Sequence, residues 1–473
     1  MEIILRQGIG LVLSIVLARL LKPEDFGVIA MLSIFLGLAG VFVDSGFGSA
    51  LIQRKDITLE DTSSVFYFNI ATALMMALLL VAAAPWIAAF YRMPILKPLT
   101  WLMALNLFIG SFRSLQAVLL TKELNFRRQM KITLVATIIS GGVAVLLAWR
   151  GWGIWSLAIQ SVVSTAVSVL MFWILSPWRP AFCFRLASLR SLFRYGSFLF
   201  LSGLLDTAYT RLNTLIIGRL YSARDLGLYS RADNIQQLPT STISTLLGRV
   251  AFPVFSAAAA GEPGALRRAA RKSLGAIMLV NTPLMLGILA TANPLVHVVF
   301  GEKWLPCVPF LRVLSVAGVF WPLQVINLNL IKSQGRSDLF FRLEIIKKVI
   351  GLTFLLVAAQ ISMMAMAWSQ LIVAVTCYFI NSAYSGKLAD YPIKDQFRDM
   401  SPYLAVAAIM LGCIWLLTLW TTLSPPLLLA AQALLGVVIY VLLCYMFKLS
   451  GFQDATLRLR GVLAQQGFVA ARA

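Results

Sequence analysis

A series of apolar stretches, each long enough to cross a lipid bilayer, constrains the fold of this chain more than any other feature. A helix needs about 20 residues to cross roughly 30 Å of hydrocarbon, and 60% of the 473 residues are hydrophobic. We predict fourteen spans, at residues 3–21, 28–53, 64–91, 97–121, 132–149, 152–175, 192–218, 226–256, 272–300, 305–331, 340–358, 361–385, 400–420 and 425–447. Because backbone polar groups must be satisfied inside lipid, the spans should be helices. The sequence therefore predicts an all-α polytopic membrane protein with about 14 transmembrane helices.

The positions of the basic residues predict which way these spans run. Most of the 40 Lys and Arg residues fall in every second connection, near residues 54–55, 122–131, 179–194, 249–272, 332–348 and 387–398 and after 448. Lys and Arg close to the ends of spans are retained on the cytoplasmic side. We therefore expect a multi-pass protein of the cytoplasmic (inner) membrane with both termini in the cytoplasm.

The same distribution accounts for the net charge of +21. In a soluble protein such a charge would suggest nucleic-acid binding, but here it follows from topology, and we expect contact with membrane lipids and no nucleic-acid partner. Five cysteines without a CxxC pair and a single His297 predict neither structural disulfides nor a metal site. No cofactor is expected. The first apolar run lacks a cleavage site, so we expect it to stay as a membrane anchor.

An internal repeat links the two halves of the chain. Residues 17–27 (LARLLKPEDFG) and 217–227 (IGRLYSARDLG) share Arg, Leu, Asp and Gly at a spacing of 200, and a weaker echo pairs 122–128 with 332–342. Because six spans separate the copies, the halves should have the same orientation, as in transporters that bind substrate between parallel repeats. We predict an N-terminal six-helix bundle at 1–180, a second at 181–398, two further spans at 399–448 and a cytoplasmic tail at 449–473, with a central cavity between the bundles.

The repeated turn has a simple structural interpretation. Pro23 stops one helix, Asp25 can cap the next, and Gly27 permits a backbone angle that other residues resist. A tight outward hairpin is sufficient to explain these residues.

The sequence resembles a known family in four segments: residues 17–27, Asp44–Gly48, Gln53–Lys55 and Gly301–Trp304. These are similar to the polysaccharide flippases of the multidrug/oligosaccharidyl-lipid/polysaccharide exporter superfamily, in particular to lipopolysaccharide and colanic-acid exporters. The resemblance implies two six-helix bundles, commonly followed by two more helices, around a cavity that opens alternately to either side. It also implies a polyprenyl-diphosphate-linked oligosaccharide as substrate. Polysaccharide polymerase and chain-length proteins are the partners that it implies.

A carrier for such a substrate needs a polar, cationic cavity, so polar residues inside spans are the candidates. An ionisable group in a span is a functional hypothesis by default, although an Arg can be held by carbonyl groups and an amide can simply link two helices. The candidate substrate-binding residues are Arg113, Gln116, Asp206, Tyr209, Arg211, Asn213, Asn234, Gln237, Gln324 and Asn327. Asp44 and Asp206 are candidates for ion coupling, and close helix contact explains Asp44 equally well.

Three functions remain in comparison. The first is a flippase or exporter of lipid-linked oligosaccharides for cell-surface polysaccharide, and the second is an ion-coupled multidrug or small-metabolite antiporter of the same fold. A membrane glycosyltransferase, polymerase or ligase would need a large outward loop with catalytic carboxylates, and the outward loops are short, so we expect no enzyme. Arg113 and Arg211 favour the first function, because a cation exporter would favour carboxylates. The sequence contains no GxxxxGK[ST] motif. With its cavity inside one chain, the carrier should be a monomer.

Overall fold

The computed structural model describes residues 2–457, and the side chains of 8–457 apart from those of 194, 195 and 249. Residues 458–473 of the expected cytoplasmic tail lie outside this part. The first eight helices are α1 (Glu2–Leu20), α2 (Pro23–Asp44), α3 (Phe47–Gln53), α4 (Leu59–Tyr91), α5 (Leu96–Lys122), α6 (Phe126–Trp149), α7 (Ile154–Leu175) and α8 (Leu186–Leu220). The others are α9 (Ala223–Ala259), α10 (Ala265–Phe300), the 3₁₀ helix η1 (Glu302–Cys307), α11 (Val308–Ser333), α12 (Ser337–Ile361), α13 (Met363–Leu388), α14 (Ile393–Trp420) and α15 (Pro425–Met446).

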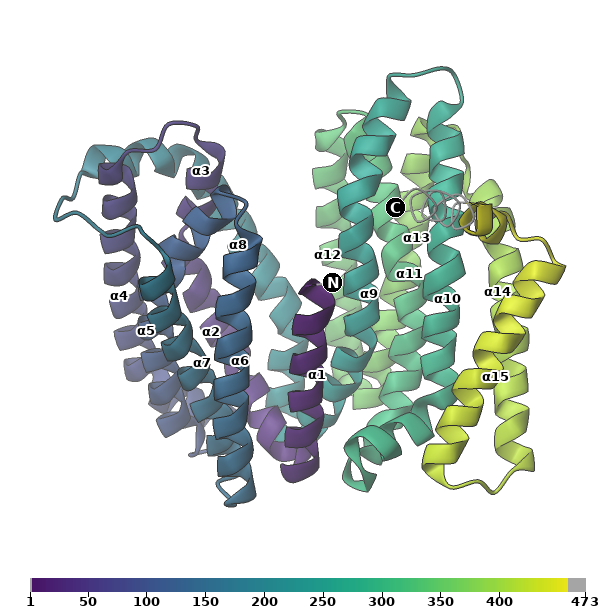
Figure 1. The fold of residues 1–473 in the computed structure, drawn as a ribbon, viewed down its shortest axis with the longest axis horizontal. Coiled ribbons are helices and arrows are strands. Elements are labelled where there is room, and N and C mark those ends of the chain that lie inside the picture. Colours follow the sequence, from purple (N-terminus) through teal and green to yellow (C-terminus); the bar gives the residue numbers. More distant parts are fainter. Residues whose placement is uncertain (1, 458–473) are drawn as a thin grey trace, which may run out of the picture. The chain divides into compact units, whose positions relative to one another are not determined.

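Every predicted span contains one long helix (Figure 1). Within the described part of the chain, 11 helices are long and apolar enough to cross a membrane. The long helices outside that group are α1, α8 and α12, of which α8 and α12 carry several charged residues. The prediction of an all-α polytopic membrane protein is confirmed.

One predicted span, 28–53, is interrupted in the structure. Helix α2 ends at Asp44 and α3 begins at Phe47, because Ser45 and Gly46 adopt left-handed backbone angles, with φ of 47° and 74°. A Cβ atom on Gly46 would overlap the backbone carbonyl of Gly196 in α8. The chain therefore turns where α2 meets α8 and cannot continue as one straight helix.

The chain forms two compact units, Met1–Ser230 (unit 1) and Arg231–Ala473 (unit 2). Unit 1 contains α1–α8 and the start of α9, and α8 packs against α2, α3 and α4. The compact unit therefore extends beyond the expected boundary at residue 180, and the division of the chain by its repeat stays a prediction. In unit 2, α14 and α15 pack against α10 and share its core.

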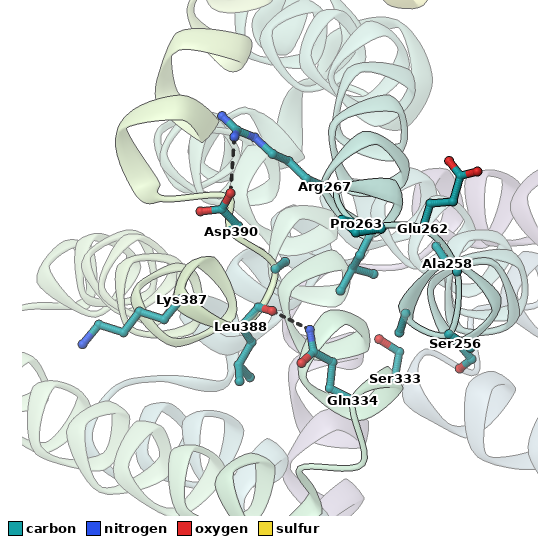
Figure 2. Close-up of a pocket in the computed structure, with 16 residues that line it drawn as sticks. Ser256, Ala258, Glu262, Pro263, Arg267, Ser333, Gln334, Lys387, Leu388 and Asp390 are labelled. Carbon is teal, nitrogen blue, oxygen red and sulfur yellow. Dashed lines mark hydrogen bonds and ion pairs between the residues drawn. The ribbon is translucent and has the colours of Figure 1, made fainter.

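Connections that were predicted to face the same side gather at one end of each unit. In unit 1, Lys122 Nζ donates to the carbonyl of Leu51, and Arg185 pairs with Glu60 at 2.7 Å. In unit 2, three such connections line a pocket of about 720 Å³, which is formed by the α9–α10 loop and the ends of α11 and α13 (Figure 2). Across it, Gln334 Nε2 donates to the carbonyl of Leu388 at 2.7 Å. In each unit, alternate connections between the helices thus lie at the same end, as a multi-pass topology requires.

The repeated turn has equivalent hydrogen bonds in both copies. The backbone N–H of Lys22 donates to Asp25 Oδ2 at 2.9 Å, and that of Ser222 donates to Asp225 Oδ2 at 3.2 Å. Both aspartates lie in the first turn of a helix, α2 or α9, and cap its N-terminus, as predicted for Asp25.

The expected reason for Gly27 was wrong. Gly27 lies inside α2 and is not among the residues with positive φ. A Cβ atom on Gly27 would instead overlap the carbonyl oxygen of Ala223, and one on Gly227 would overlap that of Pro23. These atoms are themselves related by the repeat, so both glycines are required by a close backbone contact between the starts of α2 and α9 within unit 1.

The segment Gly301–Trp304 buries a cation in unit 2. The Arg231 guanidinium lies 5.0 Å from the Phe300 ring centroid and 4.7 Å from that of Trp304, and Arg231 is 6% exposed. Such contacts between a cation and aromatic faces stabilise a charge that is removed from water. The segment therefore has a packing role against Arg231 of α9.

Candidate functional site

The most unusual polar group of unit 1 is the pair Arg113 and Gln116 on α5. Gln116 is fully buried, and neither its amide oxygen nor its amide nitrogen has a hydrogen-bond partner within the described residues. Arg113 is half-buried, and its buried Nε likewise has no partner there. The two residues are three positions apart and so lie on neighbouring positions of one helix face. A buried polar group without a hydrogen-bond partner destabilises the folded state by about 1–3 kcal/mol. Stability therefore does not explain the presence of these two side chains.

A second polar contact lies beside this pair. Asn69 in α4 is 3% exposed and donates from Nδ2 to Ser114 Oγ of α5 at 3.3 Å, while its Oδ1 has no partner within the described part of the chain. Asn69 was not predicted as a site residue. A single Asn in the apolar run around Phe68 and Ile70 was the available signal.

The candidates on α8 separate into two groups. Asn213 Nδ2 donates to the Tyr229 hydroxyl at 2.8 Å, which links α8 to the start of α9. Asp206 and Arg211 are exposed, and Tyr209 is half-buried. The helix meets α2 through Gly203 and Thr207, which lie beside Val41 and Gly37. Asn213 therefore has a structural contact, whereas Arg211 presents its charge at the surface of unit 1.

The candidates on α9 lie on the surface of unit 2. Asn234 and Gln237 are exposed, and Gln237 Nε2 donates to Asp233 Oδ2 one helical turn away, at 2.9 Å. The helix continues through Pro239. Both amide side chains remain accessible to a ligand in unit 2.

The candidates on α11 bind other helices of unit 2. Gln324 Nε2 donates to the carbonyl of Ala374 in α13 at 3.1 Å. Asn327 is 2% exposed, and its Oδ1 accepts a hydrogen bond from Ser385 Oγ at 2.8 Å. The structure thus gives both residues a helix-linking role, while their role in substrate binding stays a prediction.

Two further buried amides of unit 2 were not predicted. Asn281 donates to the carbonyls of Gly318 and Val319 at 3.1 and 3.2 Å, which joins α10 to α11. Asn381 in α13 is fully buried, and neither atom of its amide has a partner within residues 8–457. Like Asn69, each is a polar residue that follows a run of apolar ones in the sequence.

Asp44 has a local structural contact. Its carboxylate lies next to the start of α3. A Cβ atom on Gly48 would lie 2.8 Å from Asp44 Oδ1 and 3.1 Å from Val118 of α5. Asp44 therefore packs against the start of α3 at the break after α2, which supports the alternative of close helix contact. Its role in ion coupling stays a prediction.

Comparison with known proteins places the fold and the family. Residues 16–309 match the family model described as polysaccharide biosynthesis protein. The teichuronic acid biosynthesis protein TuaB of Bacillus subtilis is 29% identical over 78% of this chain and 77% of its own length. The lipopolysaccharide biosynthesis protein WzxC of Escherichia coli is 27% identical over 75% of this chain and 72% of its own, and the succinoglycan biosynthesis transport protein ExoT of Rhizobium meliloti is 29% identical over 72% and 69%.

Solved structures show the same architecture. The lipid II flippase MurJ in an inward closed conformation superposes with a TM-score of 0.75 over 96% of this chain and 98% of its own, at 16% sequence identity. An inward-facing multidrug transporter of the MATE family gives 0.63 over 81% of this chain and 96% of its own, at 15% identity. Since the family model covers more than half of the sequence, the chain belongs to the family of polysaccharide biosynthesis proteins.

Proposed function

We propose that this protein is a flippase that moves polyprenyl-diphosphate-linked oligosaccharide units across the cytoplasmic membrane for the synthesis of a cell-surface polysaccharide. Membership of the polysaccharide biosynthesis family supports the proposal, as do relatives named for teichuronic acid, lipopolysaccharide and succinoglycan. The fold of a lipid II flippase is consistent with it. Both termini would lie in the cytoplasm, in agreement with the distribution of Lys and Arg.

The chemistry of this substrate determines what the carrier must supply. The diphosphate and the sugars cannot enter hydrocarbon without large desolvation penalties, whereas the polyprenyl chain is stable there. The protein must therefore shelter an anionic headgroup among polar side chains and leave the chain in the lipid. Transport by alternating access would expose this polar region first to one side of the membrane and then to the other.

The observation that carries the proposal is the condition of Arg113. Its guanidinium lies within a membrane span, half-buried, and its Nε has no partner within the described chain. A guanidinium can donate two parallel hydrogen bonds to phosphate oxygens, which are stronger than bonds between neutral groups. Arg113 would bind the diphosphate, and Arg211, which is exposed on α8, would contribute a second positive charge. A carrier of cationic drugs would be disfavoured by both residues.

Exposed polar side chains would bind the sugars of the same substrate. Asn234 and Gln237 on α9 offer donors and acceptors at the surface of unit 2. Asp206 on α8 is exposed and would bind a sugar hydroxyl or a coupling ion. Transport would draw either on an ion gradient or on removal of the product outside the membrane, where a polymerase would consume it.

Reconstitution into lipid vesicles tests the proposal. The purified protein should transfer a fluorescent polyprenyl-diphosphate oligosaccharide between leaflets, measured as protection from an impermeant quencher. A cell that lacks the protein should accumulate the same lipid-linked sugar on the cytoplasmic side. Equal transfer by vesicles with and without the protein, together with export of a cationic dye by the protein, would overturn the proposal in favour of an antiporter.

A further inference from the structure

A groove on unit 2 is outside every site described so far. Its cavity measures about 530 Å³, and it lies between the first turns of α10, the N-terminal half of α14 and the turn 447–450 that follows α15. We refer to it as the α14 groove. Cavities of about 300–1,000 Å³ are typical of small-molecule sites, so the groove can hold a ligand headgroup with part of a chain.

The polar end of the groove carries two cations that make no ion pair with any residue that the structure describes. Arg271 is held by Asp399 at 2.7 Å, and Asp399 Oδ2 also accepts a hydrogen bond from the Tyr391 hydroxyl at 2.7 Å. Burial, followed by the hydrogen bond to Asp399, raises the pKa of Tyr391, so its hydroxyl stays protonated and remains a donor. The charge of Asp399 is thus already neutralised. These two cations are Arg398 and Lys448, which are both exposed and line the same groove.

The turn that carries Lys448 is held firmly in place. The backbone N–H of Gly451 donates to the Tyr403 hydroxyl of α14 at 2.9 Å. A Cβ atom on Gly451 would lie 2.8 Å from that oxygen, and one on Gly275 of α10 would lie 3.0 Å from it, so both glycines permit the close approach. Lys448 itself has φ of 49°, a conformation that costs free energy for a residue other than Gly. The fold therefore fixes the backbone of a lysine at the mouth of the groove.

Apolar side chains line the rest of the groove. Val406 is buried in its wall, and Ile409 and Phe447 are 46% and 60% exposed. Ile409 lies eleven residues beyond Arg398 along α14, which is about 16 Å along the helix axis. The groove therefore runs from the cationic first turns of α14 into its apolar part, as the phosphate and chains of a lipid do.

We propose that the α14 groove binds one anionic phospholipid of the cytoplasmic leaflet, with its phosphate against Arg398 and Lys448 and one acyl chain along Val406 and Ile409. Charge complementarity selects the occupant, because basic pockets between helices on the cytoplasmic side of membrane proteins bind anionic headgroups. The apolar wall selects a lipid over a free phosphate. The bound lipid would hold α14 and the turn after α15 together at the membrane surface.

Native mass spectrometry of the purified protein tests this site. The protein is titrated with phosphatidylglycerol and with phosphatidylcholine that carries the same acyl chains. We expect one phosphatidylglycerol to bind at low concentration, and the R398Q/K448Q double variant to bind it roughly thirtyfold more weakly, since each basic residue contributes about 1 kcal/mol. The matched control is K387Q/K394Q, which removes two exposed cations of unit 2 that do not line the groove. This control should bind phosphatidylglycerol within about twofold of the unchanged protein.

Two further experiments test whether the groove itself binds the lipid and whether the acyl chains contribute. Ala405→Trp fills the groove and leaves both cations in place, and it should abolish tight binding of phosphatidylglycerol. Soluble glycerol 3-phosphate should compete only at far higher concentration, because it lacks the chains. An equal loss of affinity in the two double variants, equal binding of the two lipids, or tighter binding of polyprenyl phosphate than of phosphatidylglycerol to this groove would overturn the proposal.

Discussion

Two helices that the sequence repeat predicts to be equivalent, α5 in unit 1 and α11 in unit 2, carry polar pairs with the same spacing and different surroundings. Arg113 and Gln116 lie shortly before the basic end of α5, and Gln324 and Asn327 lie shortly before the basic end of α11. Both amides of the second pair hydrogen-bond to α13. In the first pair, Gln116 is fully buried without a partner, and the Nε of Arg113 has none within the described residues.

The difference indicates which pair the fold needs and which pair it tolerates. A buried polar group that is hydrogen-bonded stabilises the helix packing by a modest amount, whereas an unpaired one is a net cost. The hydrogen bonds to α13 therefore suffice to explain the pair on α11. The pair on α5 is retained despite its cost, which is expected of a group whose partner is a ligand.

The largest effect should follow from reversal of the charge in the pair on α5. Arg113→Glu replaces two charge-assisted hydrogen bonds to a diphosphate by repulsion, and we expect transfer of the lipid-linked oligosaccharide to fall by at least about a hundredfold, since each such bond contributes about 1.5–3 kcal/mol. The vesicle assay measures transfer, and membrane abundance is followed by immunoblot. The control is Arg312→Glu, at an exposed position of α11, with about twofold change at most. Full transfer by Arg113→Glu at normal abundance would remove Arg113 from the site.

The next largest effect is a loss of stability on substitution of Asn327, in the pair on α11. Asn327→Leu keeps the branched shape of the side chain at Cγ and removes the acceptor of the Ser385 hydroxyl, so the free energy of unfolding should fall by up to about 1.7 kcal/mol, the upper end for polar contacts in membrane proteins. Thermal unfolding in detergent measures the change. Adding Ser385→Ala should restore part of the loss, because it removes a buried hydroxyl whose remaining acceptor, the carbonyl of Ser382, lies 3.5 Å away. Additive losses in the double variant would show that the hydrogen bond between Ser385 and Asn327 is not what stabilises this position.

The positions of the helices follow from the sequence, because the hydrophobic length and the spacing of basic residues are properties of each segment alone. Asp25 and Asp225 were predictable for the same reason, since a cap depends on residues three positions apart. The break at Ser45 was not, because an average over an apolar window does not respond to one glycine that meets Gly196 far along the chain.

The site is less predictable, because hydrogen-bond partners depend on which helix lies opposite. Gln116 and Asn327 look alike in the sequence, each an amide in an apolar span, and only the neighbouring helix decides that one is paired. The role of Gly27 was assigned wrongly for the same reason. Its close contact is with Ala223, 196 residues later in the chain, whereas the sequence around Gly27 suggested only a local backbone conformation.

A smaller effect, with the opposite sign, is expected for Gln116. Gln116→Leu removes two buried amide atoms that have no hydrogen-bond partner within the described residues, so the free energy of unfolding should rise by about 1 kcal/mol. Transfer of the oligosaccharide should fall several-fold, because the amide lies one turn from Arg113 and would bind the same headgroup. Thermal unfolding measures the expected rise in stability, and the vesicle assay measures the expected fall in transfer. A loss of stability as large as that of Asn327→Leu would mean that the two pairs do not differ.

The smallest effect belongs to Gln324, and it is the strictest test of the contrast between α5 and α11. Gln324→Leu removes one hydrogen bond to the carbonyl of Ala374, and the loss in the free energy of unfolding should be about 0.6 kcal/mol, the average for such contacts in a membrane protein. Transfer should change less than twofold, because this amide is occupied by α13. The variant for comparison is Arg113→Leu, in which transfer should be lost while the free energy of unfolding is not lowered. If Gln324→Leu abolished transfer at unchanged stability, the pair on α11 would contact the substrate as well, and the distinction between a binding pair and a packing pair would fail.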